Sequence, residues 1–151
     1  MYEFLKFLHI LSMFTAVSLF VGGEWYLSSL ERTGDVRAIR AGYRAGKKLD
    51  GFGVAAVVLG AVLGIVAALN GNLDLTQTWL LTAYGIFVAI MVTYWTPRSK
   101  RILEAAEASP DDAPNPALAA RINQPKDKVM LVLDLALWVG IIFVMVIKPF
   151  S

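Results

Sequence analysis

The residue best suited to bind a metal is the chain's only histidine. His9 lies inside an apolar stretch, FLKFLHILSMFTAVSLFVGGEWYLSSL, at positions 4–30. An ionisable side chain in a membrane-spanning helix is unfavourable unless it binds or pairs with something. A lone histidine cannot supply the three or four ligands of a zinc site, whereas haem iron needs only one proximal histidine. The sequence therefore predicts haem ligation by His9, and the structural alternative is a hydrogen bond to a carbonyl or hydroxyl across helices.

Met145 is the candidate for a second axial ligand. The chain has no cysteine, which excludes disulfides, thiolate metal sites, iron–sulfur clusters and covalent c-type haem. The predicted cofactor is therefore haem b. Met13 is one helical turn from His9, but ligands on opposite faces of a macrocycle normally come from different elements. Met145 is expected at the same membrane depth as His9, and ordinary packing is its alternative role.

Two acidic residues within apolar stretches, Glu24 and Asp134, are candidates for proton transfer or for structural pairing. Their positions predict that both lie in the half of the membrane opposite His9, so they form no site with it. Asp134 is expected to pair with a basic residue at a helix end, with Thr93 or with a tyrosine of the third apolar stretch. Orientation of the bundle and proton uptake remain open as its roles.

The elements that must position these residues are membrane-spanning helices. The chain has 151 residues, of which 57% are hydrophobic and 17% charged, and this balance is unlike that of a soluble domain. Four stretches are long and apolar enough to span a bilayer. The predicted fold is one all-α domain over residues 1–151, a four-transmembrane-helix up-down bundle with spans at about 4–30, 51–69, 79–96 and 129–147.

The distribution of Lys and Arg predicts the orientation of this bundle. Loops 31–50 and 97–128 carry most of the basic residues, whereas residues 70–78 carry none. The positive-inside rule places the two basic loops in the cytoplasm and both termini on the outer side, here of a bacterial inner membrane. Because the basic residues flank apolar spans, the pI of about 9.0 indicates topology and the lipid bilayer rather than a nucleic-acid partner.

Small residues recur every four positions in the second stretch. Ala56, Gly60, Gly64 and Ala68 form this stripe, and the two glycines make a GxxxG pair. Such a stripe lets another helix or a flat cofactor approach closely. Packing within the chain is the simplest interpretation, and a homodimer through Gly60 and Gly64 is the alternative.

Capping residues predict helices inside both basic loops. Asp35 precedes VRAIRAGYRAGKK and can cap a helix that continues into the second span. SKRILEAAEA is expected to form a short helix that ends at the SPDDAPNP turn. Asn115 is then predicted to cap another short helix with Pro116 at its first position.

Several short segments together resemble a known family: FLKFLHILSMF, the pair Gly22 and Gly23, LERTGD, TWLLTAY and TPRSKRI. They resemble an uncharacterised bacterial membrane family, domain of unknown function 2269. That family is similar in layout to the copper-resistance D membrane proteins and to the four-helix protoporphyrinogen oxidases, whose members bind haem b. The resemblance implies a haem ligand at His9, and no lysine on the third span matches the one that the oxidases use.

The sequence thus favours a small redox-associated membrane protein that binds b-type haem through His9 and supports electron transfer. The main alternative is a cofactor-free structural or assembly subunit of a larger respiratory or photosynthetic membrane complex. A transporter or channel is a third interpretation, although no span is visibly broken at its middle. The sequence lacks a phosphate loop, a GxSxG elbow, an HExxH pair and a dinucleotide fingerprint, so conventional hydrolases are excluded.

Overall fold

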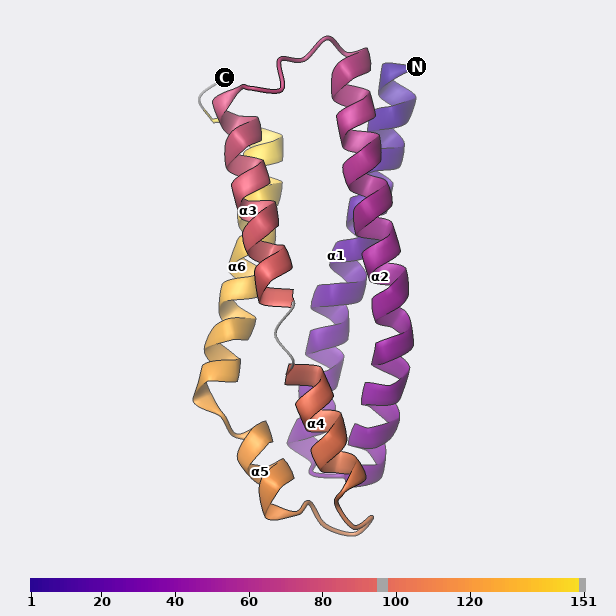
Figure 1. Cartoon of the computed structure of the whole chain (residues 1–151), viewed down its shortest axis with the longest axis vertical. Helices are drawn as coiled ribbons and strands as arrows, with labels where there is room; N and C mark the ends of the chain where they lie inside the picture. Colours follow the sequence, from indigo (N-terminus) through magenta and orange to yellow (C-terminus); the bar gives the residue numbers. More distant parts are fainter. Residues whose placement is uncertain (95–97, 150–151) are drawn as a thin grey trace.

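The computed structural model describes residues 1–94 and 98–149, and its regular elements in this part of the chain are all α-helices (Figure 1). Four helical segments are long and apolar enough to span a membrane, which confirms the predicted all-α, four-span class. The predicted end of the third span, at residues 95–96, lies outside the described residues. The helices are α1 (Tyr2–Thr33), α2 (Val36–Asn70), α3 (Thr78–Tyr94), α4 (Arg98–Glu107), α5 (Pro116–Ile122) and α6 (Pro125–Ile147).

The helices are arranged as two pairs. α1 packs along α2, and α3 packs along α6. Figure 1 shows α4 continuing below α3, and α5 below α6. The 32 residues of α1 and the 35 of α2 correspond to roughly 50 Å of helix, well beyond the ~30 Å hydrocarbon core of a bilayer. The hairpin of α1 and α2 therefore extends past the membrane at one end, where α4 and α5 pack beside it.

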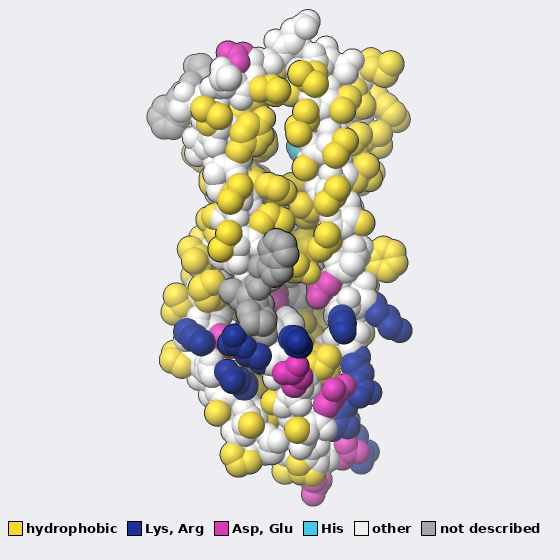
Figure 2. Space-filling view, viewed as in Figure 1, with side chains coloured by type: hydrophobic (Ala, Val, Ile, Leu, Met, Phe, Trp, Pro, Cys, Tyr) yellow, Lys and Arg dark blue, Asp and Glu magenta, His cyan; other side chains and the backbone are white. Residues whose placement is uncertain are grey.

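The end of the molecule that contains α4, α5 and residues 34–48 is called the basic end. The opposite end, where α1 begins, is called the histidine end. Figure 2 shows apolar side chains over the upper part of the molecule and a band of Lys and Arg across the lower part. Large apolar side chains such as Phe14 and Trp25 are mostly exposed. In a membrane protein this surface faces lipid.

The predicted caps explain where the helices of the basic end begin. The Asp35 side chain accepts hydrogen bonds from the backbone N–H groups of Arg37 (2.9 Å) and Ala38 (3.1 Å). α2 therefore begins at Val36 and runs without a break into the second span. The side chain of Asn115 accepts from the N–H of Leu118 at 2.8 Å, and Pro116 follows it as the first residue of α5. Both predicted caps are confirmed.

Two apolar cores stabilise the bundle. In the membrane half, Phe20 of α1 stacks on Trp138 of α6, with ring centroids 6.1 Å apart, and meets the edge of Tyr94 at 4.8 Å. This aromatic group connects the two helix pairs. At the basic end, Ile39 of α2, Ile102 of α4 and Leu118 of α5 form the centre of a second buried cluster. α4 and α5 are thus packed against the hairpin rather than lying free on its surface.

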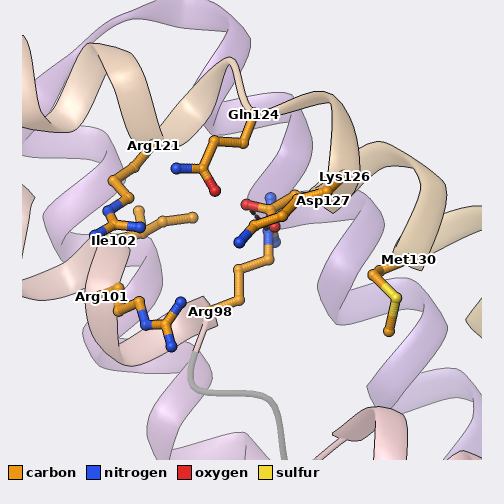
Figure 3. A pocket seen from close by; sticks show the side chains of 8 residues that line it. All are labelled: Arg98, Arg101, Ile102, Arg121, Gln124, Lys126, Asp127 and Met130. Carbon is orange, nitrogen blue, oxygen red and sulfur yellow. Dashed lines mark ion pairs between the residues drawn. The ribbon is translucent and has the colours of Figure 1, made fainter.

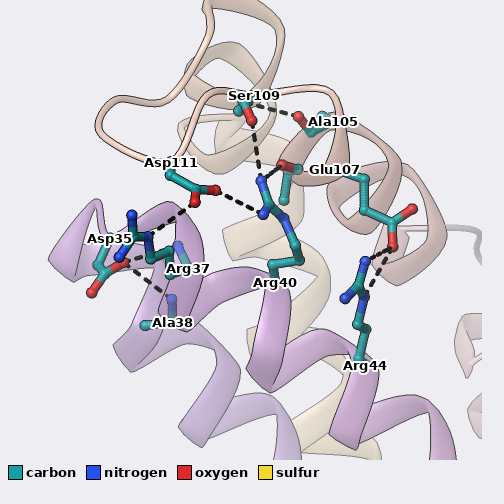
Figure 4. Close-up of polar contacts among 10 residues, drawn as sticks. Asp35, Arg37, Ala38, Arg40, Arg44, Ala105, Glu107, Ser109 and Asp111 are labelled. Carbon is teal, nitrogen blue, oxygen red and sulfur yellow. Dashed lines mark hydrogen bonds and ion pairs between the residues drawn. The ribbon is translucent and has the colours of Figure 1, made fainter.

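Arginines of α2 bind the end of α4 and the segment after it (Figure 4). Arg40 donates to the Asp111 carboxylate at 2.9 Å and to the carbonyls of Ala106 and Ser109 at 3.0 and 3.1 Å. Arg44 pairs with Glu107 at 2.8 Å. These contacts fix residues 106–111 against α2.

The contact between Arg40 and Asp111 predicts a pH dependence. The hydrogen bond from Arg40, together with the charges of Arg37 and Arg40, lowers the pKa of Asp111 below its ordinary value of 3.8. A lowered pKa stabilises the folded state above the ordinary value, and this stabilisation is lost as the pH falls through the lowered pKa. We expect amide hydrogen exchange of residues 106–115 to accelerate in that acidic range. Asp111→Asn should accelerate it already at neutral pH, whereas Asp112→Asn, at an exposed neighbouring position, should not; equal effects of the two variants would contradict the assignment.

Candidate functional site

His9 makes a defined contact with α2. Its Nδ1 lies 2.7 Å from the carbonyl oxygen of Gly60 and is partly buried. A carbonyl oxygen only accepts hydrogen bonds, so Nδ1 carries the proton and donates it. In the neutral ring, Nε2 then keeps its lone pair. The structural alternative proposed for His9, a hydrogen bond across helices, is therefore present, and it leaves one ring nitrogen able to accept a hydrogen bond or bind a metal.

The glycine stripe of α2 receives side chains of α1. A Cβ at Gly64 would lie 2.8 Å from both Nδ1 and Cε1 of His9, and a Cβ at Gly60 would lie 2.6 Å from Sδ of Met13. The absence of side chains at these two positions therefore lets the imidazole reach the α2 backbone. The stripe is occupied by a helix of the same chain, as the packing interpretation predicted.

Met145 belongs to the other helix pair. It lies on α6, next to the buried Val144, and packs against the membrane core. Figure 2 shows an opening between the two helix pairs toward the histidine end, with the cyan of the histidine at its wall. His9 and Met145 thus come from different helix pairs, as axial ligands from separate elements would. Their joint ligation of one haem stays a prediction.

The most extensive polar cluster surrounds Arg98, at the start of α4. Its guanidinium binds Glu24 at 3.0 Å, Glu31 at 2.9 and 3.0 Å and Asp127 at 3.4 Å. Glu31 is buried, with 6% of its side chain exposed, and it also accepts a hydrogen bond from the hydroxyl of Tyr43. This set of five residues, the Arg98 cluster, joins α1, α2, α4 and α6.

Asp134 has a separate partner. The hydroxyl of Thr93 donates to its carboxylate at 2.9 Å, which links α3 to α6. Thr93 was one of the predicted partners, so this prediction is confirmed. Glu24 pairs instead with Arg98. The two acids thus contribute to different helix contacts, and these contacts favour structural roles for both.

Sequence reasoning missed most of the Arg98 cluster. Glu31 and Arg98 both fall in segments that carried the family resemblance, LERTGD and TPRSKRI. Their place in these two segments was the signal in the sequence that could have indicated the cluster. Glu31 was predicted in a loop and Arg98 just before a short helix, whereas α1 continues to Thr33 and α4 begins at Arg98. The two charged side chains therefore face each other from helices.

In the described part of the chain, no three His, Asp or Glu side chains come together as a metal-binding group. A metal bound only by protein side chains therefore lacks a ligand set among these residues, since zinc needs three or four. A haem, whose macrocycle supplies the other ligands, needs only His9 and one further axial group.

The comparison with known families covers nearly the whole chain. Residues 3–149 match the family described as predicted integral membrane protein, DUF2269. The chain belongs to this family. No curated protein and no solved structure matches it. Membership in DUF2269 agrees with the four spans of the fold and assigns no activity.

The Arg98 cluster predicts a large effect of one substitution. Arg98→Gln leaves Glu31 buried without its counter-ion, and breaking a buried pair in this way costs roughly 3–5 kcal/mol. Arg44→Gln is the matched control, because Arg44 and Glu107 are 60% and 44% exposed and an exposed pair contributes at most about 1 kcal/mol. Thermal unfolding in detergent should show a much larger loss for Arg98→Gln, partly recovered when Glu31→Gln is added. Equal losses for the two arginines would contradict a structural role for the cluster.

The glycine contact predicts a second difference. In Gly64→Ala the new methyl displaces the His9 ring and breaks its bond to the Gly60 carbonyl, which lowers stability by about 1 kcal/mol or more. Gly85→Ala, on α3, is the control because its Cβ meets nothing within 4 Å; there alanine is neutral, or stabilising by up to about 1 kcal/mol through helix propensity. Detergent unfolding of both variants tests this. A Gly64→Ala protein as stable as Gly85→Ala would show that the ring is not fixed by α2.

Proposed function

We propose that this DUF2269 protein is a small redox-associated membrane protein in which His9 binds a b-type haem and supports electron transfer. The observation that carries the proposal is the Nδ1 contact with the Gly60 carbonyl. Metal-ligating histidines almost always donate their other ring N–H to a carbonyl, carboxylate or water, which sets the tautomer and the ring orientation. His9 has such a contact with a carbonyl, and Nε2 would be the ligating nitrogen.

The surroundings of His9 agree with the proposal. Nδ1 and Cε1 are the ring atoms nearest to Gly64, so Nε2 lies farther from that part of α2. Met145, from the other helix pair, is the proposed second axial ligand. A bound haem would take up and release one electron, while the protein would set its potential through the axial ligands, hydrogen bonding and burial.

The same proposal includes an orientation. We place the basic end in the cytoplasm and both termini on the outer side of a bacterial inner membrane. The band of Lys and Arg at one end of the molecule (Figure 2) supports this, because such residues are enriched in cytoplasmic loops. The haem would then lie toward the outer leaflet.

A cofactor-free structural or assembly subunit of a larger respiratory or photosynthetic complex is the second candidate. It is favoured by an apolar groove of about 280 Å³ between α2 and α3, whose walls include Val58, Val62 and Met91. A partner helix could pack there. A homodimer through Gly60 and Gly64 is less compatible with the fold, because α1 already covers both glycines.

Absorption spectroscopy separates the two candidates. We expect the oxidised and reduced spectra of detergent-purified protein, expressed with ample haem, to contain Soret and α bands. His9→Ala should abolish them. Thr15→Ala should leave them unchanged, because Thr15 is an exposed residue of α1 whose hydroxyl bonds only to its own helix, at Leu11. Met145→Leu should keep bound haem but shift the spectrum and the potential.

A wild-type protein without these bands, or a His9→Ala variant that retains them, would refute the haem proposal. In the first case the structural-subunit candidate gains support, and native co-purification of a defined complex would test it.

A further inference from the structure

A pocket of about 210 Å³ lies at the basic end, between α4, α5 and the start of α6 (Figure 3). Four cationic side chains line it: Arg98 and Arg101 from α4, Arg121 from α5 and Lys126 from α6. Among the described residues of the lining, Asp127 is the one acid. Neither the haem proposal nor the structural-subunit proposal uses this pocket.

The cations of the pocket differ in their pairing. Arg98 is bound to the Asp127 carboxylate, and to the acids of α1. By contrast, the side chains of Arg101, Arg121 and Lys126 form no ion pair or hydrogen bond with any residue in 1–94 or 98–149. Three unpaired cations from three helices therefore share one pocket, while the carboxylate beside them is already paired.

The other walls of the pocket suit a group that is polar at one end and apolar at the other. Ile102 and Met130 supply apolar surface. Figure 3 shows the amide of Gln124 among the charged side chains and Met130 on the far side of the pocket. α6 begins here without a side-chain cap, so the positive end of its helix dipole adds to the local potential.

We propose that this pocket binds the phosphate group of an anionic phospholipid. Arginine guanidinium groups bind phosphate oxygens through paired, charge-assisted hydrogen bonds, and a lysine ammonium adds a third cation. The acyl chains would leave the pocket along the apolar surface that begins at Met130. Basic pockets on the cytoplasmic side of membrane helices bind lipid headgroups by the same chemistry.

The position of the pocket favours a lipid over a soluble phosphate. It lies between the first turns of α4 and α6, at the end of the molecule where the apolar surface gives way to the band of Lys and Arg (Figure 2). This is the level of the headgroups if the apolar part lies in the bilayer.

The test uses the full chain and native mass spectrometry, with phosphatidylglycerol as the anionic probe and phosphatidylcholine as the zwitterionic one. We expect wild-type protein to retain one phosphatidylglycerol in preference to phosphatidylcholine. The combined Arg101→Gln, Arg121→Gln and Lys126→Gln variant should bind phosphatidylglycerol about tenfold more weakly or worse. A control variant removes the same charge at exposed side chains outside the pocket, at the end of α1 and in residues 34–48 of the basic end: Arg32→Gln, Lys47→Gln and Lys48→Gln.

The outcomes are distinct. Loss of binding in the pocket variant with binding kept in the control variant supports the proposal, and circular dichroism confirms that both variants are helical. Equal weakening in both variants would show general charge attraction and overturn it, as would full retention in the pocket variant. A single Arg121→Gln variant replaces the triple variant if the latter does not fold. Displacement of the lipid by ~10 mM inorganic phosphate would assign the pocket to a soluble anion and overturn the lipid source.

Discussion

The association of the two helix pairs depends on the guanidinium of Arg98. It binds Glu24 and Glu31 of α1 on one side and Asp127 of α6 on the other, so one side chain crosses the boundary between the pairs. A buried carboxylate such as Glu31 is strongly unfavourable unless its charge is paired and its oxygens are bonded. The helices must therefore meet in an arrangement that brings Arg98 to Glu31, and this requirement selects the register of α4 against α1.

The contacts between the pairs are concentrated away from His9. The Arg98 cluster and the Phe20–Trp138 stack connect the pairs at and near the basic end, whereas at the histidine end the contacts of His9 are with α2. The opening seen between the pairs (Figure 2) follows from this distribution. The ion pairs that join the two helix pairs therefore lie at the opposite end of the molecule from His9.

Much of the fold could be predicted from the sequence, because the features that determine it lie within short segments of the chain. Apolar runs of spanning length predict the four spans, and Asp35 and Asn115 predict helix starts through their own side chains. Depth along antiparallel spans made Thr93 one of several predicted partners of Asp134, and the structure selects it. The Arg98 cluster was not readable, because its members are 67–74 residues apart along the chain on the α1 side. Their meeting depends on how α4 packs against α1, and no sequence period encodes that packing.

The polar groups of this protein differ in whether their contacts within the fold leave a lone pair or a charge available for a ligand. The carboxylates of the Arg98 cluster are paired with the arginine, and Asp134 is bonded to Thr93, so these groups are accounted for by helix association. A neutral imidazole needs no counter-charge in an apolar region; one hydrogen bond to a carbonyl satisfies its donor and leaves Nε2 with a lone pair. His9 thus retains an unused lone pair within the membrane half, and Arg101, Arg121 and Lys126 retain unused positive charge at its edge. Binding of a ligand is expected where such capacity remains, because groups already paired inside the fold would have to lose those contacts first.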